Sequence, residues 1–230
     1  MASPPGRLAP DRDHLRLVIA GGIFAVFAGL FALLAVVVAR RCGPLGPDAR
    51  VLQDVVDWRS DSLTTLARAL TKLGTDVVVY PLLIMGALLC WRRTGRILPG
   101  LLAIAVFVAG QLVRVGINHT IARPRPPAAL RLVGAGGYSF PSGHTSNATM
   151  AYGLLAFLLT LTVARGRWAF IAGAAIVAIA VGLSRIYLAV HWATDVAGGW
   201  LFGLSWLTLG ALLVGVSRRR PQAAIRSSAS

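Results

Sequence analysis

Long apolar stretches recur along this 230-residue chain, and they restrict its fold more than any other feature. Several approach or exceed 18 residues, the length at which an α-helix can cross about 30 Å of hydrocarbon. Hydrophobic residues make up 56% of the chain and charged residues 13%, about half the charged share of an ordinary soluble domain. The sequence therefore predicts an all-α, polytopic membrane protein with a single domain.

Six transmembrane helices are predicted, at residues 17–39, 75–91, 97–117, 144–163, 168–187 and 193–216. Between the first two, apolar residues of the mixed segment 40–72 repeat at roughly helical spacing, with aspartates elsewhere on the wheel. We expect an extra amphipathic helix on the membrane surface there, and a solvated loop is the alternative. The six-helix membrane domain thus covers residues 17–216. Residues 1–16, Pro-rich and charged, are predicted to be a disordered tail, and residues 217–230 a basic one.

Six spans place both termini on the same side of the membrane. The number of lysines and arginines on each side barely decides the orientation of the chain. Of the 23, 12 fall on the side of the membrane that holds the termini and 11 on the other side. The cations of the terminal side, however, include those of very short loops, where the positive-inside rule is most reliable. We therefore expect both termini in the cytoplasm. The net charge of +15 does not indicate a nucleic-acid partner, because the basic residues punctuate apolar spans and form no soluble basic face.

Three short motifs stand at the edges of the predicted spans. They are ARPRP at 122–126, PSGH at 141–144, and a third that runs from Ser184-Arg185 to His191 and Asp195. The first follows the third span, the second opens the fourth, and the last joins the fifth span to the sixth. All three therefore fall on the face opposite the termini, the outer one. This follows from the span count alone, and it predicts a single site.

The residue types of these motifs suit the binding of a phosphate. Arginine binds phosphate oxygens two at a time through its planar fork, and Arg123, Arg125 and Arg185 are available. Ser142 adds a hydroxyl donor. Gly143 lets the backbone approach closely at a helix start, where free N–H groups and the helix dipole favour an anion. We therefore expect these five residues to bind the phosphate.

Two histidines and one carboxylate supply the remaining parts. His191 and Asp195 are spaced i, i+4, so one helical turn brings their side chains together. A carboxylate on one imidazole nitrogen fixes the tautomer and leaves the other nitrogen free to attack. His144 begins the opposing helix and can protonate the leaving group. The chain thus has the parts to hold a phosphate and to displace it with a histidine.

PSGH and Ser-Arg-x5-His-x3-Asp, with an upstream Arg-Pro, resemble the type 2 phosphatidate phosphatase superfamily of integral membrane lipid phosphatases, over about residues 114–200. The resemblance implies a phosphatase that uses no metal or other cofactor and works through a phosphohistidine on His191. It implies His144 as general acid and Asp195 as the residue that orients the nucleophile. The phosphate ligands that it implies are Arg125, Ser142, Gly143 and Arg185.

One position departs from the family pattern, which is Lys-x6-Arg-Pro. Counting back from Arg125 reaches Asn118 and not a lysine. Arg114 lies one helical turn before Asn118, on the same face of the helix. Our hypothesis is that Arg114 reaches forward and replaces the lysine, while Asn118 keeps a neutral hydrogen bond. The alternative is that Arg114 only extends to the outer membrane surface.

The position of the site at the membrane surface predicts a lipid phosphate that enters from the bilayer. Membrane lipids are the partners that we expect, with no nucleic acid and no obligate protein partner. An outward-facing site in a bacterial cell membrane favours a polyisoprenyl diphosphate left by cell-wall polymer assembly, such as undecaprenyl diphosphate. Phosphatidate or phosphatidylglycerol phosphate would fit the same site. A non-catalytic lipid-binding protein is the alternative from another class, and only the missing lysine favours it.

Overall fold

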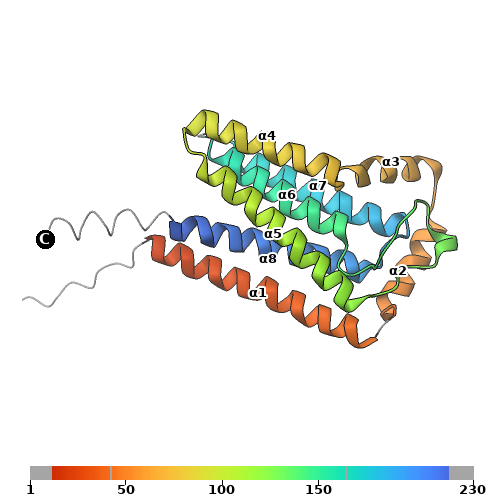
Figure 1. Cartoon of the computed structure of the whole chain (residues 1–230). Helices are drawn as coiled ribbons and strands as arrows, with labels where there is room; N and C mark the ends of the chain where they lie inside the picture. Colours follow the sequence, from red (N-terminus) through yellow and green to blue (C-terminus); the bar gives the residue numbers. More distant parts are fainter. Residues whose placement is uncertain (1–11, 42, 164, 218–230) are drawn as a thin grey trace, which may run out of the picture.

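In the computed structural model, which describes residues 12–41, 43–163 and 165–217, long α-helices form a bundle that two short helices cover at one end (Figure 1). The long helices are α1 (Arg12–Arg41), α4 (Asp76–Thr94), α5 (Leu98–Ile121), α6 (Gly143–Thr160), α7 (Arg167–Tyr187) and α8 (Ala193–Ser217). The short ones are α2 (Gly46–Asp57), α3 (Asp61–Lys72) and the 3₁₀ helix η1 (Ala128–Leu130). No strand occurs within the described ranges, so the prediction of an all-α fold is confirmed.

Five helices are long and apolar enough to cross a membrane, namely α1, α4, α5, α7 and α8. Their outward faces expose large apolar side chains such as Leu33, Leu112 and Ile176, which suits contact with lipid. The prediction of a polytopic membrane protein is therefore confirmed. Helix α6 has 18 residues, about 27 Å at 1.5 Å per residue. Its first two turns carry the polar run from His144 to Asn147, so it is less apolar than the others, and the count of six spans stays a prediction.

Helix α6 packs between α4, α7 and α8. The core of this packing includes Phe107, Met150 and Phe202. Helices α6 and α8 come especially close, because a Cβ at Gly203 would lie 2.5 Å from the Thr149 Cβ. Only glycine permits this approach, a common device between membrane helices. The close contact fixes the start of α6 against the start of α8, which brings two of the motifs together.

The mixed segment 40–72 forms two helices instead of one. Ser60 begins the second helix as its N-cap and accepts the Leu63 N–H at 3.4 Å, so the chain turns between α2 and α3. Helix α2 lies across the end of the bundle, α3 runs beside the end of α7, and both contact α7. Leu52 packs against Ala189 and Trp192, in the connection between α7 and α8. The expected amphipathic helix is therefore present as a two-helix cover over the bundle end.

The chain ends can be compared with their predictions only in part. Helix α1 begins at Arg12, inside the segment 1–16 that was expected to be a disordered tail. Helix α8 ends at Ser217, one residue beyond the predicted membrane domain. The rest of the two predicted tails, residues 1–11 and 218–230, lies outside the described residues.

Candidate active site

The ends of four helices meet at one end of the bundle, beneath α2 and α3 (Figure 1). These are the C-terminal ends of α5 and α7 and the N-terminal ends of α6 and α8, which carry or adjoin the three motifs. The first described residues of α1 and the last of α8 lie at the opposite end. The motifs therefore share one end of the bundle, as the order of the spans predicted.

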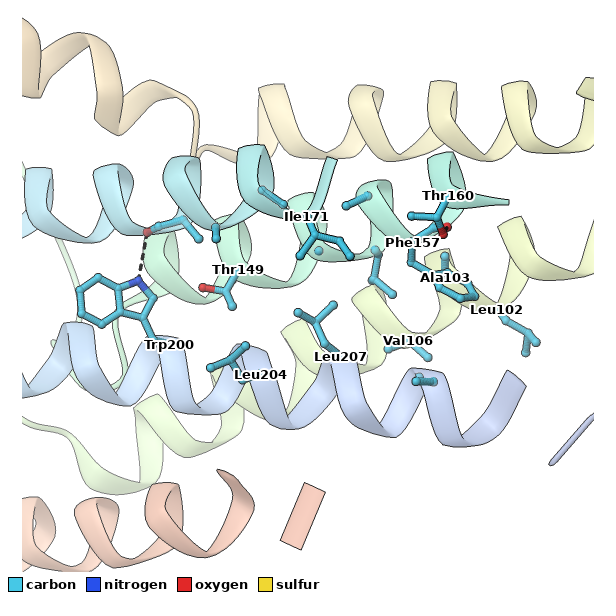
Figure 2. A pocket seen from close by; sticks show the side chains of 18 of the residues that line it. Leu102, Ala103, Val106, Thr149, Phe157, Thr160, Ile171, Trp200, Leu204 and Leu207 are labelled. Carbon is cyan, nitrogen blue, oxygen red and sulfur yellow. Dashed lines mark hydrogen bonds between the residues drawn. The ribbon is translucent and has the colours of Figure 1, made fainter. Parts of the chain in front are cut away.

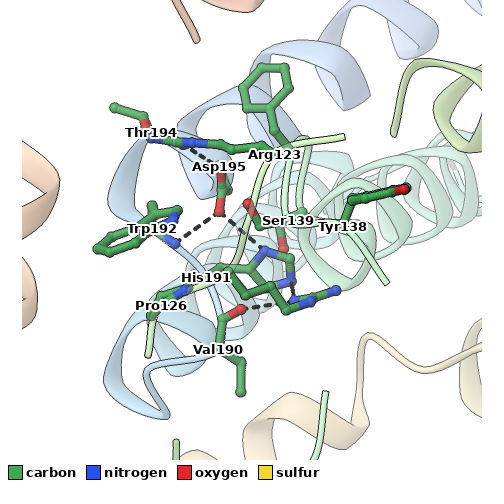
Figure 3. A network of polar contacts seen from close by, with 12 residues as sticks. Arg123, Pro126, Tyr138, Ser139, Val190, His191, Trp192, Thr194 and Asp195 are labelled. Carbon is green, nitrogen blue, oxygen red and sulfur yellow. Dashed lines mark hydrogen bonds and ion pairs between the residues drawn. The ribbon is translucent and has the colours of Figure 1, made fainter. Parts of the chain in front are cut away.

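His191 lies in the connection between α7 and α8 and is almost completely buried (Figure 3). Its Nδ1 faces the Oδ2 of Asp195, in the first turn of α8, at 3.5 Å. At this distance Nδ1 faces the carboxylate without a normal hydrogen bond. Such contacts often tighten when a substrate binds. The Trp192 backbone N–H donates to the same Oδ2 at 2.9 Å, which holds the carboxylate beside the imidazole. The predicted pairing of His191 with Asp195 is present in the structure.

Arg125 lies on the other side of the His191 imidazole. One of its terminal nitrogens, Nη1, is 2.9 Å from His191 Nε2 and donates to the Val190 carbonyl at 2.8 Å. A guanidinium only donates hydrogen bonds, so we assign the lone pair to Nε2 and the ring proton to Nδ1, facing Asp195. Burial lowers the pKa of His191 to about 4; Asp195 opposes this shift, whereas the Arg125 charge adds to it. His191 is therefore neutral near pH 7, with Nε2 beside a cation.

Arg123 does not join the other arginines, contrary to our expectation of a phosphate ligand. Its guanidinium is fully buried and forms ion pairs with Asp195 at 2.5 Å and with Asp48 at 2.7 Å. The same two terminal nitrogens also donate to the Thr194 hydroxyl and the Gly43 carbonyl. Both are therefore committed to protein acceptors. Spacing alone could not separate Arg123 from Arg125, because residues two apart in an extended segment are expected to point to the same side.

The PSGH turn opens α6 with Ser142 as its N-cap. Ser142 is fully buried; its N–H donates to the Asp195 carbonyl at 3.0 Å, and its hydroxyl oxygen accepts from Thr145 at 3.0 Å. Gly143 is the first residue of the helix, where backbone N–H groups lack intrahelical partners and the dipole favours an anion. A Cβ at Gly143 would lie 3.2 Å from a terminal nitrogen of Arg114, so the glycine leaves room for that guanidinium.

Arg185 and His144 complete a polar cluster whose other two members are His191 and Arg125. Arg185 is buried near the end of α7, where Nη1 donates to the Thr71 hydroxyl of α3 at 2.7 Å. Its buried Nε has no hydrogen-bond partner within the described residues, which is costly unless a ligand supplies an acceptor. His144 is half-buried in the first turn of α6, within electrostatic range of Arg185, His191 and Arg125. The structure thus brings these four predicted residues together.

Arg114 turns toward the start of α6. Its Nε donates to the Gln111 side-chain oxygen at 3.0 Å, and the Gln111 amide nitrogen lies 3.4 Å from the Asp76 carboxylate. Asn147 donates to the same carboxylate oxygen at 2.7 Å. Together with the contact to Gly143, this geometry favours a guanidinium held near the site over one that extends to the surface. That Arg114 replaces the missing lysine stays a hypothesis.

Asn118 makes the neutral hydrogen bonds that the sequence predicted. Its amide nitrogen donates to the carbonyls of Tyr138 at 3.2 Å and Phe140 at 3.0 Å. Within the same loop, Ser139 donates its hydroxyl to the Pro124 carbonyl at 3.1 Å. The loop that joins α5 to α6 is therefore tied to the end of α5 from one side and to the ARPRP segment from the other.

Three polar residues at the site were not found from the sequence: Asp48 in α2, Thr71 in α3 and Asp76 in α4. Each lies in or just after the mixed segment 40–72, which showed only an amphipathic pattern. For Asp48 one signal existed. It follows a proline at a helix start, and its carboxylate accepts the Leu45 backbone N–H at 2.9 Å, as in a capping box. That signal predicts a helix start but not the contact with Arg123.

Among the described residues of the chain, no cluster of three or more histidine, cysteine or acidic side chains could hold a metal ion. Outside the polar cluster, the structure contains an apolar cavity. The cavity has a volume of about 630 Å³ and lies between α5, α6, α7 and α8 (Figure 2). Val106, Leu204 and Leu207 line it, and so does Trp200, whose indole N–H donates to the Ala178 carbonyl at 3.0 Å. No residue of the polar cluster lines this cavity, so it is separate from the candidate site.

Three comparisons relate these features to known proteins. The family model of the PAP2 superfamily matches residues 98–219. Phosphatidylglycerophosphatase B of Bacillus subtilis (strain 168) is 35% identical over 164 residues, which cover 68% of this chain and 78% of that protein. An undecaprenyl-diphosphatase of Sulfolobus acidocaldarius is 33% identical over 152 residues, which cover 64% of this chain and 68% of that protein.

The fold agrees with these matches. A crystal structure of a PAP2-type phosphatidylglycerolphosphate phosphatase from Bacillus subtilis superimposes with a TM-score of 0.75 and 28% sequence identity, over 82% of this chain and 94% of that one. The family model covers more than half of the chain, from α5 through α8, and so includes all three motifs. On this evidence, the chain belongs to the PAP2 superfamily and is a membrane-embedded lipid phosphatase.

Proposed function

We propose that this chain hydrolyses the phosphate or diphosphate of a membrane lipid through a covalent phosphohistidine on His191. The observation that carries the proposal is the convergence of His191, His144, Arg125 and Arg185 at one end of the bundle. The lone pair of His191 Nε2 and the buried, unpaired Nε of Arg185 are the groups that a phosphoryl transfer needs. The proposed reaction needs no metal, because side chains and backbone N–H groups supply the charge and the protons.

The reaction then proceeds in two steps. In the first, His191 Nε2 forms a bond to phosphorus, the bond from phosphorus to the lipid oxygen breaks, and His144 gives its proton to that oxygen. Arg125 and Arg185 neutralise the other phosphate oxygens. In the second step, His144 takes a proton from water, the water oxygen attacks phosphorus, and the N–P bond to His191 breaks. Asp195 balances the positive charge of the imidazole between the steps.

The lipid that we favour is a polyisoprenyl diphosphate, and phosphatidylglycerol phosphate is the second candidate. An undecaprenyl-diphosphatase is among the relatives, and an outward-facing site would meet such lipids after polymer transfer. The second candidate is favoured by the relative with 35% identity and by the structural neighbour, both of which are named for phosphatidylglycerophosphate. Arg114 would give the site a further cation, which suits two linked phosphates.

The proposed orientation places the site on the outer face and both termini in the cytoplasm. Three arginines at the end opposite the site support it, because Arg92 and Arg93 lie in the last turn of α4 and Arg96 in the short loop that follows. A reporter enzyme that is active only in the cytoplasm, fused to the C-terminus, should be active in intact cells. An inactive but expressed fusion would reverse the orientation.

The test is phosphate release by the purified protein in detergent with EDTA. A polyisoprenyl diphosphate, phosphatidylglycerol phosphate and phosphatidate are offered in parallel, with His191→Ala as the control. We expect release in EDTA that disappears in the variant, and the ratio of the rates identifies the preferred lipid. Equal release by His191→Ala would overturn the proposed mechanism, and loss of the wild-type activity in EDTA would overturn its metal independence.

A further inference from the structure

We propose that Asp48 and Arg123 are positioning residues, which hold Asp195 in the orientation that keeps the His191 nucleophile in its reactive tautomer. Asp48 lies in α2, outside the three motifs and outside the matched family region 98–219. The inference rests on the proposed function, because it assumes that His191 Nε2 attacks phosphorus. It concerns how the chain keeps that nitrogen unprotonated.

The Asp195 carboxylate is held from two sides (Figure 3). Oδ1 accepts from Arg123 at 2.5 Å, and Oδ2 accepts from the Trp192 backbone N–H at 2.9 Å. Only the remaining direction of Oδ2 is open to His191, whose Nδ1 lies 3.5 Å away. A rotation of the carboxylate toward any other partner would therefore break one of two short hydrogen bonds. Arg123 thus fixes the angle at which Asp195 meets the imidazole.

Arg123 is in turn held by Asp48. The guanidinium divides its two terminal nitrogens between the carboxylates, with Nη2 donating to Asp48 at 2.7 Å. All three charged side chains are fully buried, so removing one charge would leave its partner uncompensated. Together they carry one net negative charge beside His191. That charge stabilises the imidazole when it becomes positive, whereas a neutral pair of Arg123 and Asp195 would not.

Asp48 also connects α2 to the first turn of α8. Its Oδ1 accepts the backbone N–H of Thr194 at 2.9 Å, and its Oδ2 accepts the Leu45 N–H at 2.9 Å. One carboxylate therefore satisfies donors at the starts of two helices. Thr194 directly precedes Asp195, so this contact fixes the backbone that carries the orienting carboxylate. The short cover helix α2 is thereby coupled to the nucleophile.

The test compares Asp48→Asn with Asp54→Asn, the same change at an exposed position of the same helix. The first readout is turnover on the preferred lipid. We expect Asp48→Asn to lower kcat about tenfold with little change in KM, as for other partners that orient a reacting group indirectly. Asp54→Asn should match the wild type. A residue that only stabilises α2 would lower the melting temperature and leave kcat of the folded protein unchanged.

The second readout does not depend on activity. In protein labelled with ¹⁵N-histidine, the His191 signals are assigned by their loss in His191→Gln. At pH 7 the wild type should show a protonated Nδ1 and an unprotonated Nε2, and Asp48→Asn should show a mixture of tautomers. Wild-type kcat and an unmixed tautomer in folded Asp48→Asn would overturn the inference alone. Undiminished activity of His191→Ala would instead overturn the proposed function.

Arg123→Lys supplies an independent variant if Asp48→Asn does not fold. It keeps the positive charge but loses the fork that contacts two carboxylates at once. We expect the same fall in kcat, of about tenfold, and the same mixing of tautomers. Wild-type values of both in the folded variant would overturn the positioning role of Arg123.

Discussion

The candidate site has two supporting networks, and they differ in charge and burial. On the α8 side, Asp48, Arg123 and Asp195 form fully buried ion pairs of 2.7 Å and 2.5 Å. On the α5 side, Arg114 reaches the exposed Asp76 only through the neutral Gln111, with contacts of 3.0 Å and 3.4 Å. In the proposed mechanism, the first network orients a nucleophile, which must keep one position. The second would face the phosphate, whose oxygens move during the reaction, so a looser support would suffice there.

The α8 side should give the largest effect. We expect His191→Ala to lower phosphate release about 10⁴-fold or more, because the proposed mechanism forms its covalent intermediate on His191. His119→Ala is the matched control, since His119 is exposed and its ring packs edge-on against the Tyr138 ring. Release that persists in His191→Ala, or that disappears in the control, would contradict the assignment of the nucleophile.

Asp195→Asn should give the next largest effect, a fall in kcat of about 10²–10³-fold. The amide cannot balance the imidazole charge, and it leaves the Arg123 guanidinium with one carboxylate in place of two. Stopped-flow measurement of the first turnover would locate the loss in the chemical step. If the first turnover kept its wild-type rate, Asp195 would have no part in orienting His191.

Arg114→Ala should lower kcat/KM about tenfold to a hundredfold, and Arg114→Lys should recover part of it. Gln111→Leu should have a smaller effect, because it removes the hydrogen bond to Arg114 but keeps the charge. Steady-state kinetics on folded variants would check both. Unchanged turnover in Arg114→Ala would show that this cation does not replace the family lysine.

The smallest effect concerns pH between 7 and 5. Burial lowers the pKa of His191 to about 4, so the neutral nucleophile persists as the pH falls and is lost only when the pH passes through that value. With an ordinary histidine pKa, kcat/KM would fall about 25-fold between pH 7 and pH 5. We expect less than about a twofold change from this group. A fall in kcat/KM of about 25-fold, with the protein still folded, would contradict the buried setting of His191.

The helices and the meeting of the motifs were predictable, because each depends on pattern along the chain. Apolar stretches marked the long helices to within a few residues, and the alternation of spans placed PSGH at the same end of the bundle as His191. The i, i+4 spacing likewise predicted the contact of His191 with Asp195. These relations are local, or they follow from the bilayer, which gives the spans similar lengths and makes successive spans cross in opposite directions.

The partners of the arginines were not predictable in the same way. Arg123 and Arg125 both precede a proline, yet one meets Asp48 and the other His191. The difference arises from α2 and α3, which fold over the bundle end. They bring Asp48 to Arg123, 75 positions later in the chain, and Thr71 to Arg185, 114 positions later. Such contacts depend on tertiary packing, and an amphipathic pattern indicates only that a helix has two faces.

The polar start of α6 has a consequence for how the chain is made. A segment enters the bilayer from the translocation channel according to its own apolarity, and the first turn of α6 carries His144, Thr145 and Ser146. Helix α7 follows after a short loop and is long and apolar enough to cross a membrane. We therefore expect α6 to be retained by the channel until α7 has been synthesised, and the two to enter the bilayer as a hairpin. On this expectation, the polar side chains that open α6 make its membrane integration dependent on its neighbour.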